Sequence, residues 1–299
     1  MLNGESDKNN YFLDEELKKY LDKIINNQEA GEAHTFLYIY LESLNVLDSK
    51  WVGENLLPNF SSMDDDKLNI SWQGYLSNST FNLETCRKLN DAFLFTIKDI
   101  SRISDINFRK KFISVYTLMC VDVVEDPLLK YIPDLYLHSD EFVRNFYSHL
   151  LRTLKIKNVS EKDNIWKRWL EQFIYNRINN IPNLYKVDEA KWILLILLEF
   201  YFLSNNVENI INIMEKKIES PLKILYKCKE TDINDENNST IQLILTFCLE
   251  SIFIDKEDMI DSFSKELVED ILTSLFKKGY DLSEDLVDIC SNLNIKISK

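Results

Sequence analysis

The stretch Trp51–Leu76, WVGENLLPNFSSMDDDKLNISWQGYL, decides how the chain folds. In a chain of 299 residues it holds two of the five tryptophans, two of the five glycines and one of the five prolines, so helix interruptions are concentrated there. Gly53 and Pro58 break a continuous helix and the acidic run 64–66 favours solvent, whereas the large apolar side chains of the stretch favour burial. We therefore expect a short irregular wedge, packed by helices on either side.

Two runs of residues form patterns that can be compared with known families. The first run reads Asp-x-x-Trp, Leu-Leu-Pro-x-Phe and Trp-Gln-Gly-Tyr-Leu, and two apolar positions precede it. Its residues are Phe36, Leu37, Asp48, Trp51, Leu56, Leu57, Pro58, Phe60, Trp72, Gln73, Gly74, Tyr75 and Leu76. The second comprises Trp169, Arg177, Ile181, Pro182, Glu189 and Trp192. Together they extend over roughly half of the chain. They resemble a helical domain of unknown function found C-terminal to sirtuin-like NADase domains in bacterial anti-phage defence proteins.

The resemblance implies a setting and structural roles, because none of the matching residues carries known chemistry in that family. The chain lacks the glycine-rich nucleotide motif that the NADase domain requires, so any NADase activity would reside in another domain or subunit. Polar side chains inside the wedge must find hydrogen-bond partners. We expect Gln73 to cap the exposed backbone around Pro58.

The composition favours long helices in a globular protein. The chain is 45% hydrophobic and 28% charged, with only five glycines and five prolines to interrupt helices. Apolar residues recur at helical spacing in about a dozen segments, among them 13–25, 33–47 and 107–124, and no segment alternates as a strand does. This predicts an all-α fold, an irregular α-solenoid or multi-helix array of paired antiparallel helices, with halves at 1–155 and 156–299.

Local signals place several helix ends. Pro133 should limit a short helix, Ser160 with Asp163 resembles a capping box, and Thr240 should cap a later helix. The polar segment KETDINDENN at 229–238 is the best candidate for disorder or a nicking site.

The net charge of −14 is concentrated near the end of the chain, where residues 230–299 hold 16 acidic and 6 basic side chains. Such a balance argues against nucleic acid and anionic membranes as main partners. It permits a basic protein partner, although surplus acids also serve solubility alone. Glu266, Glu269 and Asp270 form the candidate acidic partner surface.

Chemical motifs are absent from the sequence. The five cysteines are widely spaced without C-x-x-C, so we expect neither a zinc site nor a disulfide framework, and the polar first ten residues suggest no secretory signal and hence a cytoplasmic protein. The apolar segment 190–203 is too short to span a membrane. Without a phosphate-binding loop we expect no cofactor.

Three functions compete at this stage. The first is a non-catalytic sensor or scaffold region of an anti-phage system that binds a protein partner. The second is an immunity protein that neutralises a basic toxin through its acidic C-terminal quarter. The third is an enzyme that uses His138, Glu141 and His149 in a cleft, although two histidines without a third ligand make a poor metal site.

Overall fold

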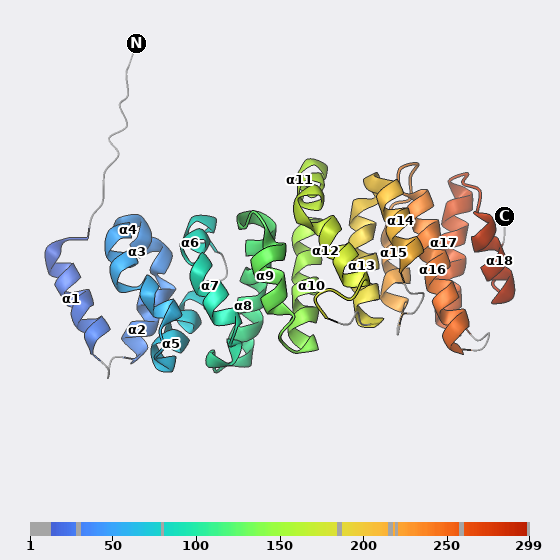
Figure 1. The fold of residues 1–299 in the computed structure, drawn as a ribbon. Coiled ribbons are helices and arrows are strands. Elements are labelled where there is room, and N and C mark those ends of the chain that lie inside the picture. Colours follow the sequence, from blue (N-terminus) through green and yellow to red (C-terminus); the bar gives the residue numbers. More distant parts are fainter. Residues whose placement is uncertain are drawn as a thin grey trace, which may run out of the picture. The chain divides into compact units, whose positions relative to one another are not determined.

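In the computed structural model, residues 13–27, 31–78, 81–183, 187–214, 218, 221–256 and 260–297 are described. All regular elements within these ranges are helices (Figure 1), which confirms the expected all-α array. The chain divides into two compact units, residues 1–149 and 150–299.

The N-terminal unit is a succession of short helices. They are α1 (Glu15–Asn26), α2 (Gly31–Ile39), α3 (Leu41–Leu47), α4 (Ser49–Asn55), η1 (Leu57–Ser61), α5 (Asp65–Leu76), α6 (Leu83–Lys88), α7 (Asn90–Ile97), η2 (Ile100–Arg102), α8 (Ile106–Leu118), η3 (Met119–Val123) and α9 (Pro127–Leu135), followed by α10 (Asp140–Lys155), which runs across the boundary. The element η3 is one π-helical turn that continues α8.

The C-terminal unit contains longer helices. They are α11 (Val159–Ile165), the π-helical turn η4 (Trp166–Leu170), α12 (Glu171–Ile178), α13 (Val187–Leu197), η5 (Leu198–Leu203), α14 (Ser204–Ile213), α15 (Leu222–Glu230), α16 (Asn238–Lys256), α17 (Ser262–Lys277) and α18 (Glu284–Asn292). Gly279 has φ 85°, and the amide of Tyr280 bonds back to the carbonyl of Leu275 at 3.1 Å. A left-handed glycine thus ends α17 in a Schellman motif.

Aromatic rings fill the core of the N-terminal unit. Contacting rings pass from α2 through η1, α5, α7 and α8 to α9, with centroid separations of 4.5 to 6.5 Å; the members are Tyr38, Phe60, Trp72, Tyr75, Phe93, Phe112, Tyr116 and Tyr131. Most of these rings are fully buried. Large flat side chains let short helices at varied angles share one core, since each ring buries much apolar area.

Aliphatic side chains dominate the core of the C-terminal unit. Every residue from Ile193 to Leu198 is buried, and α16 contributes Ile241, Ile244, Leu245 and Leu249. A helix that is apolar around its whole circumference must be covered on all sides. Residues 193–198 of the apolar segment therefore lie in the core of this unit. Within the described residues, no helix is long and apolar enough to cross a membrane.

The wedge predicted at 51–76 is less irregular than expected. Trp51 lies in α4, the second half of the stretch is the regular helix α5, and only residues 56–64 depart from α-helix, with Pro58 in the first turn of η1. The run 64–66 is exposed, as expected, but it starts a helix instead of forming a loop. Asp64 is the N-cap of α5, and acidic residues favour the first turn of a helix.

Other local predictions also require correction. Pro133 lies inside α9, and α16 begins at Asn238, two residues before Thr240. The capping box of α11 is formed by Asn158 and Glu161, so it starts two residues earlier than the predicted Ser160 pair.

The segment 229–238 is an ordered connection rather than a disordered loop. Asn237 is buried, and its side chain accepts a hydrogen bond from the amide of Asn234 at 2.8 Å and donates to the carbonyl of Asp232 at 2.9 Å. Lys278 forms an ion pair with Asp232 at 2.5 Å. The segment is polar because its side chains bond to its own backbone and to Lys278 at the end of α17.

Candidate functional site

The first motif run forms one packed junction in the N-terminal unit. The indole Nε1 of Trp72 donates hydrogen bonds to the carbonyl oxygen of Phe60 at 3.2 Å and to Oγ1 of Thr96 at 2.9 Å. The Phe60 ring meets the Trp72 ring edge-on, with centroids 4.9 Å apart. Leu57 and Pro58 form the first turn of η1, which brings Phe60 to this position. Both rings are fully buried, so they join η1, α5 and α7 and offer no surface to a ligand.

Trp51 ties α4 to α1. Its indole Nε1 donates to Oδ1 of Asp22 at 3.0 Å, and its backbone amide donates to Oδ1 of Asp48 at 3.0 Å. Lys18 lies 3.0 Å from the other oxygen of Asp48. The amide of Trp51 and the ammonium of Lys18 hold the pKa of Asp48 below its usual range. The carboxylate therefore serves as a helix cap.

Gly74 allows α5 to approach α2 closely. A Cβ atom at this position would lie 2.6 Å from the carbonyl oxygen of Thr35 and 2.6 Å from Cβ of Tyr38. Both atoms belong to α2, and neither can move without moving that helix. The motif glycine is thus required by packing.

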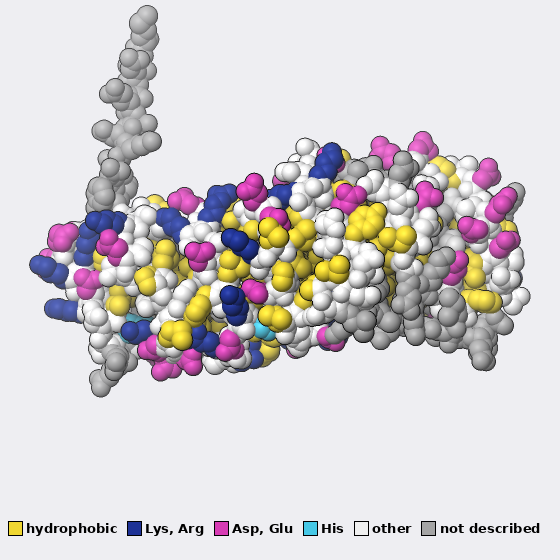
Figure 2. Space-filling model, viewed as in Figure 1, with side chains coloured by type: hydrophobic (Ala, Val, Ile, Leu, Met, Phe, Trp, Pro, Cys, Tyr) yellow, Lys and Arg dark blue, Asp and Glu magenta, His cyan; other side chains and the backbone are white. Residues whose placement is uncertain are grey.

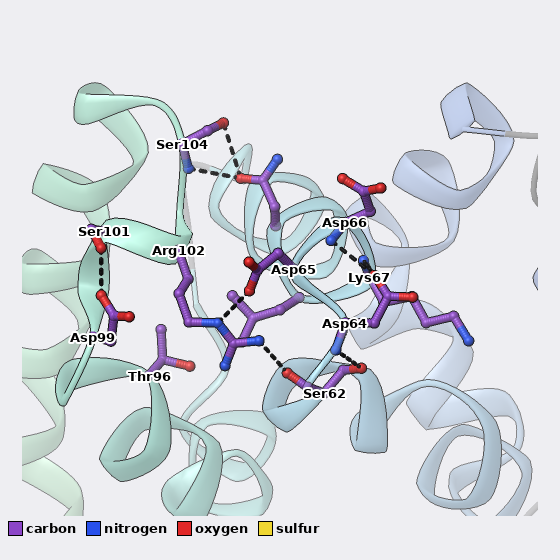
Figure 3. Close-up of polar contacts among 12 residues, drawn as sticks. Ser62, Asp64, Asp65, Asp66, Lys67, Thr96, Asp99, Ser101, Arg102 and Ser104 are labelled. Atoms are coloured by element: carbon purple, nitrogen blue, oxygen red, sulfur yellow. Dashed lines mark hydrogen bonds and ion pairs between the residues drawn. The ribbon is translucent and has the colours of Figure 1, made fainter.

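The acidic run 64–66 belongs to a polar network beside η2 (Figure 3). Asp64 accepts hydrogen bonds from the amides of Asp66 and Lys67. Arg102 Nε lies 2.6 Å from Oδ1 of Asp65, and its Nη2 donates to the carbonyl of Ser62 at 2.7 Å. Asp66 points away from Arg102 (Figure 3). Asp64 therefore caps the start of α5, and Asp65 connects α5 to η2.

Gln73 has partners other than the predicted one. Its Nε2 donates to Oδ1 of Asn69 at 3.0 Å and to Oγ of Ser104 at 3.2 Å, so it does not cap the backbone around Pro58. Asn69 also accepts from the backbone amide of Ser104 at 2.9 Å. Gln73 thus connects α5 to the segment before α8.

The second motif run forms a buried clamp in the C-terminal unit. Arg177 binds Glu189 through two parallel hydrogen bonds, Nε to Oε1 at 2.9 Å and Nη2 to Oε2 at 2.8 Å. Its Nη1 donates to the carbonyl of Asn183 at 3.0 Å. The Ile181–Pro182 peptide is cis. This two-point pairing fixes the end of α12 to the start of α13. Trp169 and Trp192 are buried in the same unit.

A second buried ion pair was not foreseen in the sequence. Glu199, which interrupts the apolar segment 190–203, lies 3.0 Å from Nζ of Lys162 and 3.5 Å from Nζ of Lys227. Side chains of Lys162 and Glu199 are each only 11% exposed. The charge is tolerated in an apolar helix because cations from α11 and α15 compensate it. The only sequence signal was the isolated glutamate itself.

The cysteines lack the properties of a nucleophile. All five are buried. Burial raises the pKa of Cys228 to about 12 and that of Cys290 to about 11, and it also raises the pKa of Cys86 and Cys248. A thiol that stays protonated and out of reach of solvent is a core side chain.

His138 and Glu141 each have a partner within the chain. His138 bonds through Nε2 to the carbonyl of Ile97, and Glu141 pairs with Lys110 at 2.9 Å. Among the described residues, no group of three His, Cys, Asp or Glu side chains could hold a metal ion.

The acidic surface lies on α17. Glu266 and Asp270 are exposed, while Glu269 is half-buried and accepts a hydrogen bond from the amide of Lys296 at 3.3 Å. Asp270 forms an ion pair with Lys229 at 2.6 Å. Acidic side chains also gather over α17 and α18 in Figure 2. Two of the three residues are thus already engaged within the chain.

Two hollows are open to solvent. One of about 370 Å³ lies in the C-terminal unit and is lined by Glu208, Gln242, Asp281 and Asp285. One of about 440 Å³ lies in the N-terminal unit beside Leu129. In the wall of the hollow of the C-terminal unit, Gln242 donates a hydrogen bond to the carbonyl of Asp281 and accepts one from the amide of Ser283. Most of the residues that line the first hollow are polar.

Comparisons with protein-family models, curated proteins and solved structures gave no match.

Proposed function

We propose that the chain is a non-catalytic helical scaffold or sensor of a bacterial anti-phage defence system, and that it acts by binding a protein partner. The resemblance of the two motif runs supports the setting. Their residues hold helices together at three places, through Gly74, through Trp72 and through the Arg177–Glu189 pair. These structural roles support a shared framework.

The observation that carries partner binding is the set of large apolar side chains left on the surface. Phe36 is 57% exposed and Tyr40 is 58% exposed. The amide of Tyr40 bonds to the carbonyl of Phe36 at 3.1 Å, so the helical path continues between them and both lie on one side. Over the N-terminal unit, apolar side chains reach the surface between charged ones (Figure 2). Exposed aromatic groups are the commonest anchors of protein interfaces.

The experiment is affinity capture of the tagged chain from its native host, with and without phage infection. We expect the wild-type chain to retain a sirtuin-like NADase or a phage structural protein. A Phe36→Ser/Tyr40→Ser variant should lose it, because the aromatic anchors are removed. An Ile156→Ser/Val159→Ser variant removes two exposed apolar side chains from the other unit and should retain the partner.

The defence proposal fails if two results coincide. One is that neither an NADase nor a phage protein is retained by the wild-type chain. The other is that a host lacking the gene resists phage as well as its parent does.

The runner-up is an immunity protein that blocks a basic toxin. Glu266 and Asp270 are exposed and lie one helical turn apart on α17, as an electrostatic docking surface requires. A Glu266→Lys/Asp270→Lys variant should then associate with the toxin more slowly and with a weaker dependence on salt. Unchanged association kinetics would eliminate this function, and recovery of a small basic toxin in the capture experiment would favour it.

A further inference from the structure

The hollow of about 370 Å³ in the C-terminal unit is lined by residues from three helices that pack together. Within this unit, α16 contacts both α14 and α18. The lining consists of residues 238–240 at the start of α16, of Glu208 on α14, and of Asp281, Ser283 and Asp285 around the start of α18. Small-molecule sites are typically hollows of about 300 to 1,000 Å³, so this one has the size of a ligand site.

Two helices begin at this hollow. Residues 238–240 form the first turn of α16, and Ser283 is the N-cap of α18. The Ser283 side chain makes no capping bond, and its amide donates to Gln242. The first amides of an α-helix have no partner inside the helix, and together they carry about half a positive elementary charge. The wall of the hollow therefore holds donors of the kind that bind a carboxylate.

The hydroxyl of Thr240 is a buried polar group that lacks a partner. Thr240 is only 3% exposed and lines the hollow, and its side chain forms no hydrogen bond with any described residue. The other buried polar side chains of the lining, Gln242 and Thr246, are bonded within the chain. Buried polar groups are nearly always hydrogen-bonded. An unpaired hydroxyl in the wall of an open hollow therefore indicates a partner from outside the chain.

Three carboxylates line the same hollow. They belong to Glu208, Asp281 and Asp285, and the described part of the lining includes no Lys, Arg or His. None of the three forms an ion pair with a described residue, whereas Asp232 and Asp270 in the same unit are each paired with a lysine. Like charges around one hollow repel one another until a cation enters it. The hollow thus has both uncompensated acceptors and uncompensated donors.

We propose that the hollow binds a free basic amino acid. Its α-carboxylate lies at the starts of α16 and α18, where the helix amides and the Thr240 hydroxyl donate to it. Its α-ammonium and its cationic side chain pair with Glu208, Asp281 and Asp285. The site belongs to the C-terminal unit and does not use the exposed aromatic side chains of the N-terminal unit, so it goes beyond the proposed protein partner.

Other small ligands satisfy only part of this wall. An inorganic anion accepts from the helix amides but is repelled by the carboxylates. A diamine pairs with the carboxylates but leaves the Thr240 hydroxyl and the helix amides without an acceptor. Among the described residues, no three His, Cys, Asp or Glu side chains are grouped as metal ligands, so the carboxylates suit an extended organic cation better than a metal ion. A basic amino acid supplies one carboxylate and two cationic groups at once.

The test is calorimetric titration of the full chain with L-arginine. An Asp281→Asn/Asp285→Asn variant should weaken binding by about tenfold or more, because two countercharges are lost. The hydrogen bonds of Gln242 go to backbone groups, so this variant retains them. The matched control, Glu284→Gln/Asp288→Asn, removes two exposed carboxylates of α18 that do not line the hollow. It should bind arginine within about threefold of wild type.

Two analogues of arginine test the two ends of the ligand separately. Agmatine lacks the carboxylate and N-acetyl-L-arginine lacks the α-ammonium charge, so each should bind about tenfold more weakly than arginine. Thr240→Val removes only a hydroxyl, and it should weaken the binding of arginine by about fivefold while leaving that of agmatine unchanged.

Several results would overturn the proposal. One is that arginine shows no measurable binding, and another is that the lining and control variants lose equal affinity. Agmatine that binds as tightly as arginine would show a site for a simple cation, with no role for the helix starts. N-acetyl-L-arginine that binds as tightly would show that the α-ammonium makes no contact, which a free amino acid requires.

Discussion

Gly74 and Gly53 are both helical glycines with opposite surroundings. A Cβ at Gly74 would meet two atoms of α2 at 2.6 Å, whereas a Cβ at Gly53 would meet nothing within 4 Å. A Gly74→Ala substitution should therefore force α2 and α5 apart and lower the free energy of unfolding by about 2 kcal/mol.

The matched substitution at Gly53 should raise the free energy of unfolding instead of lowering it. Gly53→Ala adds helix propensity in α4 without a clash and should raise stability by about 0.5 kcal/mol. Urea unfolding followed by far-UV circular dichroism measures both variants. Equal effects of the two substitutions would show that the close approach of α5 to α2 does not exist.

The pair Arg177–Glu189 leads to a second prediction at this scale. Glu189→Gln removes the countercharge that pairs with the guanidinium of Arg177, a side chain that is only 1% exposed. It should cost about 3 kcal/mol or more. An Arg177→Met/Glu189→Leu double variant should recover most of that loss, since it removes both charges from the core. A double-mutant cycle by urea unfolding measures the coupling, and a double variant as unstable as Glu189→Gln would refute the charge argument.

At the scale of the element, periodicity predicted where helices lie better than where they begin. The apolar repeat at 13–25 became α1, but the segment 33–47 is divided into α2 and α3 at Tyr40. The segment 107–124 likewise ends in a π-helical turn that its apolar pattern did not reveal. Helix ends depend on which side chain captures a free amide, and several Ser, Asn and Asp residues compete for that role.

The start of α11 makes this competition measurable. Asn158 accepts from the amide of Glu161 at 3.0 Å, and Glu161 accepts from the amide of Asn158 at 2.9 Å. Asn158→Ala should lower the free energy of unfolding by about 1 kcal/mol. The amide of Glu161 loses its acceptor, and the bond from the amide of residue 158 to the Glu161 side chain is weakened. Ser160→Ala, at the position that the sequence favoured, should change it by less than about 0.5 kcal/mol. Chemical denaturation compares them, and a larger effect at Ser160 would place the cap where the sequence analysis did.

Across the whole molecule, contacts between distant residues are what the sequence could not predict. Arg177 and Glu189 were identified as motif positions, but their pairing required the structure. Glu199 was noticed as an interruption, whereas its partners Lys162 and Lys227 lie on other helices. Surfaces of helical arrays are assembled from distant residues, so they leave no compact motif.

Alkaline pH should destabilise both units. Burial raises the pKa of Tyr38 to about 12 in the N-terminal unit and that of Cys228 to about 12 in the C-terminal unit, from ordinary values of 10.0 and 9.0. Above pH 9 the unfolded chain loses these protons before the folded chain does. The unfolded state then binds fewer protons, so stability falls as pH rises through the window from about 9 to about 12. Each unit of pKa difference contributes about 1.4 kcal/mol per group.

Urea midpoints measured between pH 7 and pH 11 test this expectation. We expect a plateau up to about pH 9 and a fall above it, set by the unfolded-state pKa of the thiols. Cys228→Ala removes one of the groups that carry the fall, so its stability should decline less steeply with pH, whatever its stability at pH 7. A midpoint that stays constant up to pH 11 would contradict the burial of these thiols and phenols.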